Sequence, residues 1–432
     1  MAEEREGAVG NDLTAASKWK EQLSVFNTAA LIAIAMFCAS HVFTNASLSV
    51  IQDHFNYLDM PAIRAGTTNV SLVNMITMII VSAVVNRQIG GFRLKYRTCG
   101  VFGMLLVAIG GVAPVFLNDW NVILIFRYLL GVGMGFINVR NGMIMLSYKD
   151  PKKQTQIMGY SIALFNLMAV LASPIDGWLS DQFGWRGAYM IYIPAVVILI
   201  YCIFFLKEPP YADEAAEKQQ AEVKVKTSLK DKISPMLIVY VILMAFMTAG
   251  TYPILSGFSS FMRANGYQSA ALAGTIMMFF NIAGVLCNMV LSQITKYIKG
   301  RWLFSICFAI FAAGYWICLN MDNPFLLMAG VFCIGMGYKV VMSVAISWAG
   351  QQSSAENKTF TTTLTYAGTQ FGNYFSNVYI AVCFALVNHP LGDAASQYHA
   401  QFWVNIALAV LFLVWNVSPD RKKKEQLVPK TE

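Results

Sequence analysis

The sequence is poor in charged residues, in histidine and in any cysteine pattern. Only 12% of its 432 residues are charged and 4 are histidine, whereas 57% are hydrophobic and the mean hydropathy is +0.54. A soluble domain carries about 25% charged residues, so this chain has too little polar surface for a water-soluble fold. The eight cysteines lie in or beside apolar runs without a CxxC spacing, which predicts buried thiols and no disulfide or metal site.

Motifs for catalysis and for nucleotide binding are also missing. The sequence contains no nucleotide-binding loop, no metal-ligand cluster and no nucleophile motif. We therefore expect no enzyme activity, no ATP-driven pumping and no cofactor. The first 24 residues are polar and lack the hydrophobic core of a signal peptide, so no cleavage is expected.

Long apolar runs are what the sequence has in abundance. Each is about 20 residues long, enough to cross the roughly 30 Å hydrocarbon layer as a helix. Backbone groups in lipid must bond within their own segment, which favours helices over strands. The sequence thus predicts an all-α membrane protein with twelve transmembrane helices, at 25–48, 66–86, 98–117, 121–147, 155–174, 187–206, 235–258, 269–292, 302–319, 324–348, 359–387 and 401–417.

A charged stretch divides these helices into two sets of six. The two sets share a weak repeat, since GVGMGF at 131–136 resembles CIGMGY at 333–338. Internal repeats of this kind are typical of transporter folds. The predicted domains are an N-terminal tail, two pseudo-symmetric six-helix bundles joined by a linker, and a C-terminal tail, at 1–24, 25–206, 207–234, 235–417 and 418–432.

The distribution of basic residues predicts the orientation. Twenty-five of the 31 Lys and Arg residues fall in the tails, the linker and the loops on one side, and three fall on the other: Arg64, Arg186 and Arg263. The positive-inside rule therefore predicts a multi-pass protein of the cell membrane with both termini and the linker in the cytoplasm. The net charge of +8 reflects this orientation and requires no nucleic-acid partner.

Three basic residues remain inside the predicted spans: Arg127, Arg140 and Lys339. No span contains Asp or Glu between its ends, so these cations have no predicted carboxylate partner. Lys339 lies 14 residues after Phe325 and well inside the hydrocarbon, where a charge costs about 2.5–3.5 kcal/mol. Its ammonium could extend to the interface, lie over Tyr338 or another aromatic ring, or bind an anion in a water-filled cavity.

Two segments resemble the major facilitator superfamily. SPIDGWLSDQFGWRGAYMIYIP at 173–194 resembles the family's signature between helices 5 and 6, and IFRYLLGVGMG resembles its helix 4 motif. The loop after helix 2 departs from the family pattern, because Asn86 precedes Arg87 where the family carries an aspartate. The residues in motif positions, to which the resemblance gives structural or gating roles, are Pro174, Gly177, Gly184, Trp185, Arg186, Arg127, Gly131, Gly133, Asn86 and Arg87. The resemblance implies two bundles around a central cavity and transport by rocking of the two halves.

Arg140 is the second candidate for substrate binding. In the repeat alignment Lys339 falls opposite Ile137, and Arg140 is three positions later on the same helical face. Arg127 lies about 220° around that helix from Arg140, and we expect it to bind backbone carbonyls. Weaker candidates are His41, the only histidine inside a predicted span, with Asn45, Tyr338 and Tyr252.

These residues favour a secondary active or facilitative transporter for a small organic anion, most simply a carboxylate. The lack of an intramembrane acid argues for exchange or uniport by alternating access and against a proton-coupling carboxylate. The alternative is a proton-coupled exporter of an amphipathic compound that uses His41, and a non-transporting membrane sensor is a third. The expected partners are the lipid bilayer and the solute, with the chain as a monomer.

Overall fold

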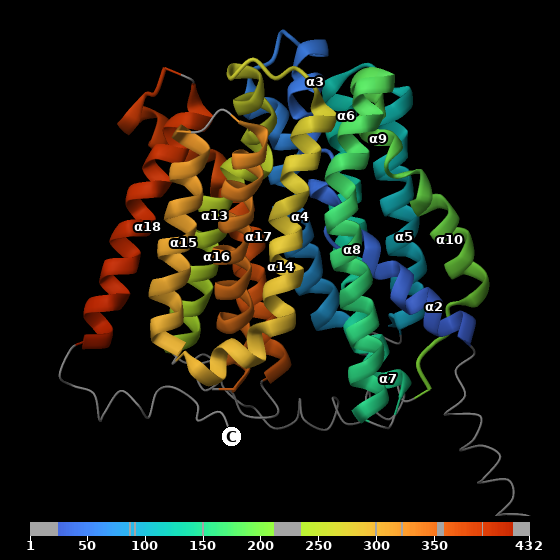
Figure 1. Cartoon of the computed structure of the whole chain (residues 1–432). Coiled ribbons are helices and arrows are strands. Elements are labelled where there is room, and N and C mark those ends of the chain that lie inside the picture. Colours follow the sequence, from blue (N-terminus) through green and yellow to red (C-terminus); the bar gives the residue numbers. More distant parts are fainter. Residues whose placement is uncertain are drawn as a thin grey trace, which may run out of the picture.

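The computed structural model describes residues 25–85, 88–89, 92–148, 151–210, 235–298, 300–320, 323–351, 358–390 and 392–417. Both predicted tails, most of the predicted linker, Asn86 and Arg87 lie outside the described residues. The described part is a bundle of long, roughly parallel helices (Figure 1). We call the end of the bundle that carries α3 the upper end and the end at which α18 finishes the lower end, as in Figure 1.

The described first half of the chain contains nine α-helices and five short 3₁₀ helices, with a pair of two-residue strands between α4 and α5. In chain order these are α2 (Val25–Ala33), η1 (Ile34–Phe37), η2 (Ser40–Val42), η3 (Asn45–Ser47), α3 (Leu48–His54), α4 (Met60–Val84), β1 (Gln88–Ile89), β2 (Phe92–Arg93), α5 (Tyr96–Val112), η4 (Ala113–Phe116), α6 (Trp120–Ile137), α7 (Arg140–Ser147), α8 (Pro151–Phe183), η5 (Gly184–Arg186), α9 (Gly187–Met190) and α10 (Ile193–Phe205).

The second half consists of longer and less interrupted helices. These are α13 (Pro235–Ala264), α14 (Ala270–Tyr297), α15 (Gly300–Asn320), α16 (Pro324–Gln351), α17 (Lys358–Val387) and α18 (Asp393–Val417). The prediction of an all-α membrane fold is confirmed. Nine described segments are long and apolar enough to cross a membrane, or ten if the bent pair Val25–Phe37 and Ser40–His54 is one span. One of the nine, Gln156–Phe205, contains two predicted helices, and the more polar α17 is 30 residues long.

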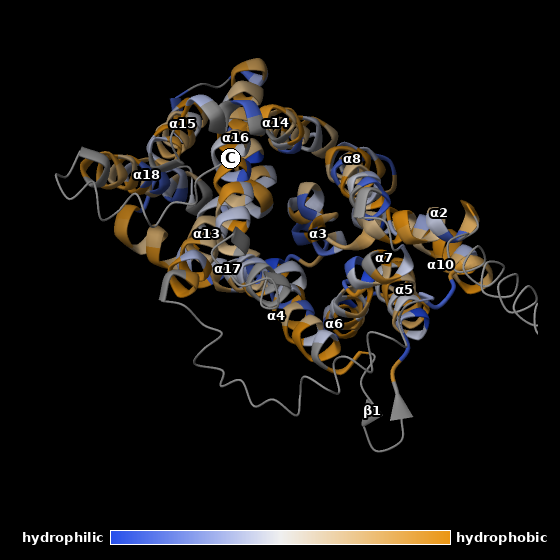
Figure 2. Ribbon diagram, turned by 90° about the horizontal axis from the view of Figure 1, so that it is seen from below, coloured by the Kyte–Doolittle hydropathy of each residue, from blue (hydrophilic) through white to orange (hydrophobic). Residues whose placement is uncertain are grey.

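Each half has its own hydrophobic core, and the two halves meet along two helix pairs. One buried cluster is built from α2 to α10 and a second from α13 to α18. Between the halves α8 packs along α14 and α4 along α17, with α3 near the centre of the view from below (Figure 2). Ala46 of η3 belongs to the second cluster although it lies in the first half of the chain. The segment around η3 is therefore held between the halves.

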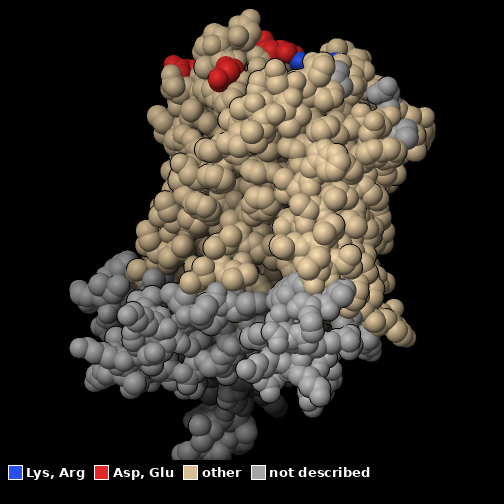
Figure 3. All heavy atoms as spheres, turned by 90° about the vertical axis from the view of Figure 1, so that its left-hand side faces the viewer, with Lys and Arg blue, Asp and Glu red and all other residues tan. Residues whose placement is uncertain are grey.

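The outer surface fits a lipid environment. Figure 3 shows one face on which acidic and basic side chains are confined to the upper rim, with none in the broad band below it down to the grey atoms. Large apolar side chains are exposed along the helices, such as Phe204 on α10, Met289 on α14 and Trp403 on α18. Such exposed apolar area is costly in water and favourable against acyl chains.

One prediction about the membrane interior is wrong. The span predicted at 155–174 continues to Phe183, because Pro174 lies inside α8 and does not end it. Proline is tolerated in membrane helices where neighbouring helices satisfy the freed backbone groups. Asp176 consequently lies within the helix with no exposed surface. The bundle therefore does contain an acid between the ends of a span.

Two further boundaries differ from the prediction. Helix α4 begins at Met60, so Arg64 lies in its first turns with 1% of its surface exposed and is not a loop residue. Helix α18 begins at Asp393, and its apolar span from Ala395 includes His399. His41 is therefore not the only histidine inside a span. Both errors arise because polar residues at a helix end resemble loop residues in sequence.

Candidate functional site

The first predicted helix is broken into short 3₁₀ pieces, which leaves backbone carbonyls available for side chains. Arg127 uses this break: its Nη2 donates to the carbonyl of His41 at 2.9 Å and its Nε to the carbonyl of Gly66 at 2.8 Å. Its Nη1 donates to the Tyr192 hydroxyl at 2.8 Å, and that hydroxyl donates to the carbonyl of Ser40. Arg127 is thus satisfied by neutral acceptors and ties the broken helix to α4 and α6.

His41 and Asn45 lie on this broken segment and are almost fully buried, with 2% and 1% of their surface exposed. His41 Nε2 lies 3.4 Å from Asn373 Nδ2 of α17, in the other half. Its Nδ1 and both side-chain polar atoms of Asn45 have no hydrogen-bond partner among the described residues. Tyr252 is also buried and crosses between the halves, with its hydroxyl 2.8 Å from Thr67 Oγ1.

Arg140 begins α7, after a break in the fourth predicted helix. Asn138 and Val139 are turn residues there, and Asn138 Nδ2 donates to the carbonyl of Met134 and to Asn74 Oδ1. The continuous helix across 137–140, which the prediction of a shared face assumed, is therefore interrupted. Arg140 nevertheless remains inside the bundle with 8% of its surface exposed.

The hydrogen-bonding capacity of Arg140 is incompletely used. Its Nη1 lies 3.3 Å from Cys38 Sγ, and its Nη2 donates to Asn141 Oδ1 at 3.0 Å. Its Nε is buried and has no partner, and Arg140 forms no ion pair with any carboxylate of the described residues. A buried guanidinium donor without an acceptor is costly, so a ligand oxygen would be stabilised here.

Lys339 lies near the middle of α16 and is half-buried. Its stem passes Gly284 of α14, where an added Cβ would lie 2.8 Å from the lysine Cγ. Its ammonium lies over the ring of Phe280, 5.4 Å from the centroid, and 5.9 Å from that of Tyr338. Phe280 is one turn closer to the upper end than Gly284, so the ammonium does not extend towards the lower interface. The geometry favours the aromatic contact over interfacial extension.

Tyr338 extends the aromatic surroundings of Lys339. It stacks on Phe280 with ring centroids 5.9 Å apart, and its hydroxyl lies 3.1 Å from Thr248 Oγ1. Arg140 thus comes from the first half of the chain, and Lys339 with its aromatic neighbours comes from the second.

The segment from Pro174 to Arg186 forms a corner at the upper end. Gly184 has φ +64°, a conformation that glycine adopts without strain, and it ends α8. Arg186 then donates to the carbonyl of Val115 at 3.1 Å and to Asn118 Oδ1 at 2.5 Å. Trp185 is buried and stacks on His54 with centroids 4.7 Å apart. The corner fixes the start of η5 and α9 against η4 and α3.

Several of the predicted motif glycines allow backbones to touch. A Cβ on Gly131 would lie 2.8 Å from the carbonyl oxygen of Val70, and one on Gly133 would lie 2.7 Å from that of Gly103. Gly177 has the same role between the halves, where a Cβ would lie 2.2 Å from the carbonyl oxygen of Ala270. Gly274 on α14 faces the carbonyl oxygen of Ser173 in the same way, at 2.1 Å.

The two halves are joined at the upper end by charged side chains. Arg263 at the end of α13 forms an ion pair with Asp53 of α3. The carboxylate of Asp181 accepts hydrogen bonds from the backbone N–H groups of Ala270 and Ala271 at the start of α14, both at 3.0 Å. Nearer the middle, Asn281 Nδ2 donates to the carbonyl of Ala169 and Asn377 Nδ2 to Thr68 Oγ1. The structure is thus closed at its upper end.

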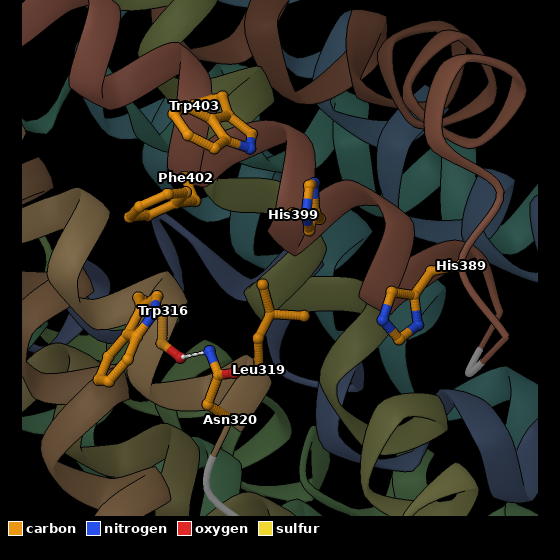
Figure 4. Close-up of a pocket in the computed structure, with 7 residues that line it drawn as sticks. All are labelled: Trp316, Leu319, Asn320, His389, His399, Phe402 and Trp403. Carbon is orange, nitrogen blue, oxygen red and sulfur yellow. Dashed lines mark hydrogen bonds between the residues drawn. The ribbon is translucent and has the colours of Figure 1, made fainter.

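A pocket of about 290 Å³ opens elsewhere, between α15 and α18 at the upper end of the second half (Figure 4). It is lined by Trp316, Leu319, Asn320, His389, His399, Phe402 and Trp403. Asn320 Nδ2 is already bonded to the carbonyl of Trp316 at 2.8 Å. The pocket contains neither predicted cation and is separate from the interface between the halves.

Comparison with known proteins identifies the family. The sequence matches the family model described as Major Facilitator Superfamily over residues 28–300 and 242–432. The chain therefore belongs to the major facilitator superfamily and is a multi-pass membrane transporter, not an enzyme.

Individual relatives are distant. The chain is 26% identical over 265 residues to monocarboxylate transporter 4 of Gallus gallus, covering 59% of this chain and 55% of that protein. It is 24% identical over 147 residues to the cis,cis-muconate transport protein of Acinetobacter baylyi, covering 32% and 36%. A probable sugar efflux transporter of Mannheimia succiniciproducens is 22% identical over 282 residues, covering 65% and 64%. The matches thus span about a third to two thirds of these relatives.

Solved structures show the same fold at low identity. The crystal structure of a D-xylose-proton symporter superimposes with a TM-score of 0.69 and 14% identity, covering 93% of this chain and 99% of that one. At this identity the likeness extends to the fold alone. The substrate must therefore be argued from the residues of this chain.

Proposed function

We propose that this transporter carries a small organic anion, most simply a carboxylate, by alternating access between its two halves. The observation that carries the proposal is the state of Arg140 and Lys339. Both are held inside the bundle, and neither forms an ion pair among the described residues. An anion between them would accept the unused donors and neutralise charge that the protein itself leaves unpaired.

The surroundings of the two cations suit a substrate with an apolar part. Phe280 and Tyr338 supply ring faces beside the ammonium of Lys339. An anionic group could bind the cations while a short carbon chain packs on the rings. The names of two relatives, a monocarboxylate transporter and a muconate transport protein, agree with this chemistry.

The rest of the predicted site belongs to the same proposal. His41, Asn45 and Tyr252 form the buried polar seam between the halves, so they would contact solute only when the halves separate. The chain would work as a monomer in the cell membrane, with two six-helix domains, a cytoplasmic linker and cytoplasmic termini. The site remains compatible with exchange or uniport. However, the presence of Asp176 removes the argument for these modes that relied on the lack of an intramembrane carboxylate.

A proton-coupled exporter of an amphipathic compound is the second candidate. The observation in its favour is the buried His41, whose Nδ1 has no partner among the described residues. The efflux protein among the relatives agrees with this alternative. The two candidates differ in the solute, a small organic anion or an amphipathic compound, and in the need for a proton.

A counterflow screen in proteoliposomes tests the proposal. Vesicles loaded with unlabelled acetate, lactate, pyruvate, benzoate or succinate would be diluted into the matching labelled solute, with glucose and choline as neutral and cationic controls. We expect transient accumulation of at least one carboxylate and none of glucose or choline. Counterflow of neutral or cationic solutes alone would contradict an anion site.

A further inference from the structure

Asp176 is a carboxylate that the proposed anion site does not use, and it lies entirely inside the protein. It is seven residues before the end of α8, about 10 Å below the upper end of that helix. Neither carboxylate oxygen makes a hydrogen bond of normal geometry, and both are buried. Among the described residues no Lys or Arg forms an ion pair with it. An ionised carboxylate in such surroundings is strongly disfavoured.

The polar groups nearest to this carboxylate come from the broken first helix. They are the Ser47 hydroxyl and the backbone N–H groups of Ala46 and Ser47 in η3. The Ser47 hydroxyl also donates a hydrogen bond to the backbone carbonyl of Asp176 at 3.2 Å. It accepts a hydrogen bond from the Ser180 hydroxyl at 2.6 Å. These groups carry no charge, and their donors stabilise a carboxylate only in part, so the preference for the neutral acid comes from the burial of both oxygens.

The charged and titratable groups near Asp176 lie on α6, on α9 and in the turn that follows α9. Arg127 of α6 is close enough to act on it electrostatically, as are the rings of Tyr189 and Tyr192. Three nitrogens of Arg127 already donate to other acceptors. The facing part of α14, residues 270–277, carries no titratable side chain. No partner therefore holds Asp176 in its ionised form here.

The burial of Asp176 depends on contact between the halves. The segment η3 covers it, and Ala46 of η3 packs in the core cluster of the second half. The next residue, Gly177, touches the backbone of Ala270 on α14. Separation of α14 from α8 at the upper end would remove the support that the second half gives to η3, and it would admit water to the carboxylate from that side.

We propose that Asp176 is a proton-binding site that takes up a proton when the upper end closes and releases it there when the upper end opens. The proton binds one carboxylate oxygen and gives a neutral carboxylic acid, and no other bond forms or breaks. Closing of the upper end is thus linked to the uptake of one proton and opening to its release, with no net proton transfer across the membrane in this step alone. The inference requires alternation between two states and is independent of the charge of the solute.

The test measures how pH changes the closed fraction, without any solute. Spin labels on Tyr57→Cys and Gln268→Cys, both exposed at the upper end and in different halves, report its separation as a distance distribution. Seven native cysteines are buried, and Cys333 is replaced by alanine. We expect the closed-to-open ratio to fall between pH 5 and 9 by up to about tenfold per pH unit, the limit for one proton.

Variants separate Asp176 from other titrating groups. Asp176→Asn should stay closed across the whole pH range, whereas Asp176→Glu should keep the response. Asp119→Asn alters an exposed carboxylate that caps α6 in the same half, so it should keep the response. An unchanged pH response in Asp176→Asn, or a constant closed fraction in the unsubstituted protein, would overturn the proposal.

Discussion

Asp181, in the last turn of α8, accepts a hydrogen bond from the backbone N–H of Ala270, the first residue of α14, at 3.0 Å. One half of the transporter thus supplies a capping carboxylate to a helix in the other half, in addition to that helix's own N-cap residue Ser269. The carboxylate also meets the positive end of the α14 dipole. This contact exists only when the upper end is closed, so it stabilises the closed state relative to the open one.

Asp181→Asn should therefore open the upper end. Asparagine keeps one acceptor oxygen but loses the charge and the second acceptor that binds Ala271. A negative charge at a helix N-terminus is worth about 0.3–1 kcal/mol, so its loss should lower the closed-to-open ratio by about twofold to fivefold. Spin labels at positions 57 and 268 measure it, and Asp119→Asn, an N-cap within one half, is the matched control. Equal ratios in the two variants would contradict this role.

The two cations should act together on the solute. Lys339→Met keeps the side-chain length and removes the charge, and transport should fall at least about tenfold because a charge-assisted contact is worth about 1.5–3 kcal/mol. Arg140→Met should do the same, and the double variant should be less than additive if both bind one solute. Initial counterflow rates at matched protein amount measure these effects.

A structural role for Lys339 predicts a different result. If its ammonium only packs on Phe280 and Tyr338, Lys339→Met should transport at the rate of the unsubstituted protein, since methionine also packs well on aromatic rings. Lys339→Arg offers a second comparison. A planar guanidinium cannot occupy the position of a compact ammonium over the same ring without moving the bound anion, so we expect a clear loss.

The position of Lys339 can be tested without changing its charge. Gly284→Ala would place a methyl group 2.8 Å from the lysine Cγ, which forces the side chain away from its ring contacts. We expect a rise of about tenfold in the half-saturating concentration of the transported carboxylate. Gly159→Ala on α8 is the control, since a Cβ there meets nothing within 4 Å. Identical transport in both variants would show that the lysine position is unimportant.

The orientation of the chain is a separate prediction. A reporter enzyme or accessible tag inserted after residue 220, or fused to either terminus, should be found in the cytoplasm. A tag near Asp119 or Asp393 should be found outside. The physical reason is the excess of Lys and Arg in the linker, the tails and the loops on one side. Labelling by a membrane-impermeant reagent in intact cells measures this, and an external linker would contradict the charge rule.

The helices and their grouping were predictable because membrane spans are long and apolar. Arg140 and Lys339 were also identifiable, since a cation in an apolar run is conspicuous. The neighbours of Lys339 on α14 were not, because Phe280 and Gly284 are ordinary residues that only packing brings close to it. Asp176 was missed for a local reason: Pro174 resembles a helix end in sequence, and only the surrounding helices show that α8 continues.

The reciprocal backbone contacts at Gly177 and Gly274 have a consequence for the speed of the transport cycle. Where α8 meets α14, each helix presents a bare peptide surface to the other. Ordinary helix pairs interlock by side chains that must change rotamer before the helices can part. At these two positions no such rearrangement is needed, so this part of the interface should add little steric barrier to separation. The hydrogen bonds of Asp181 beside the contact would then contribute more to that barrier than side-chain interlocking does.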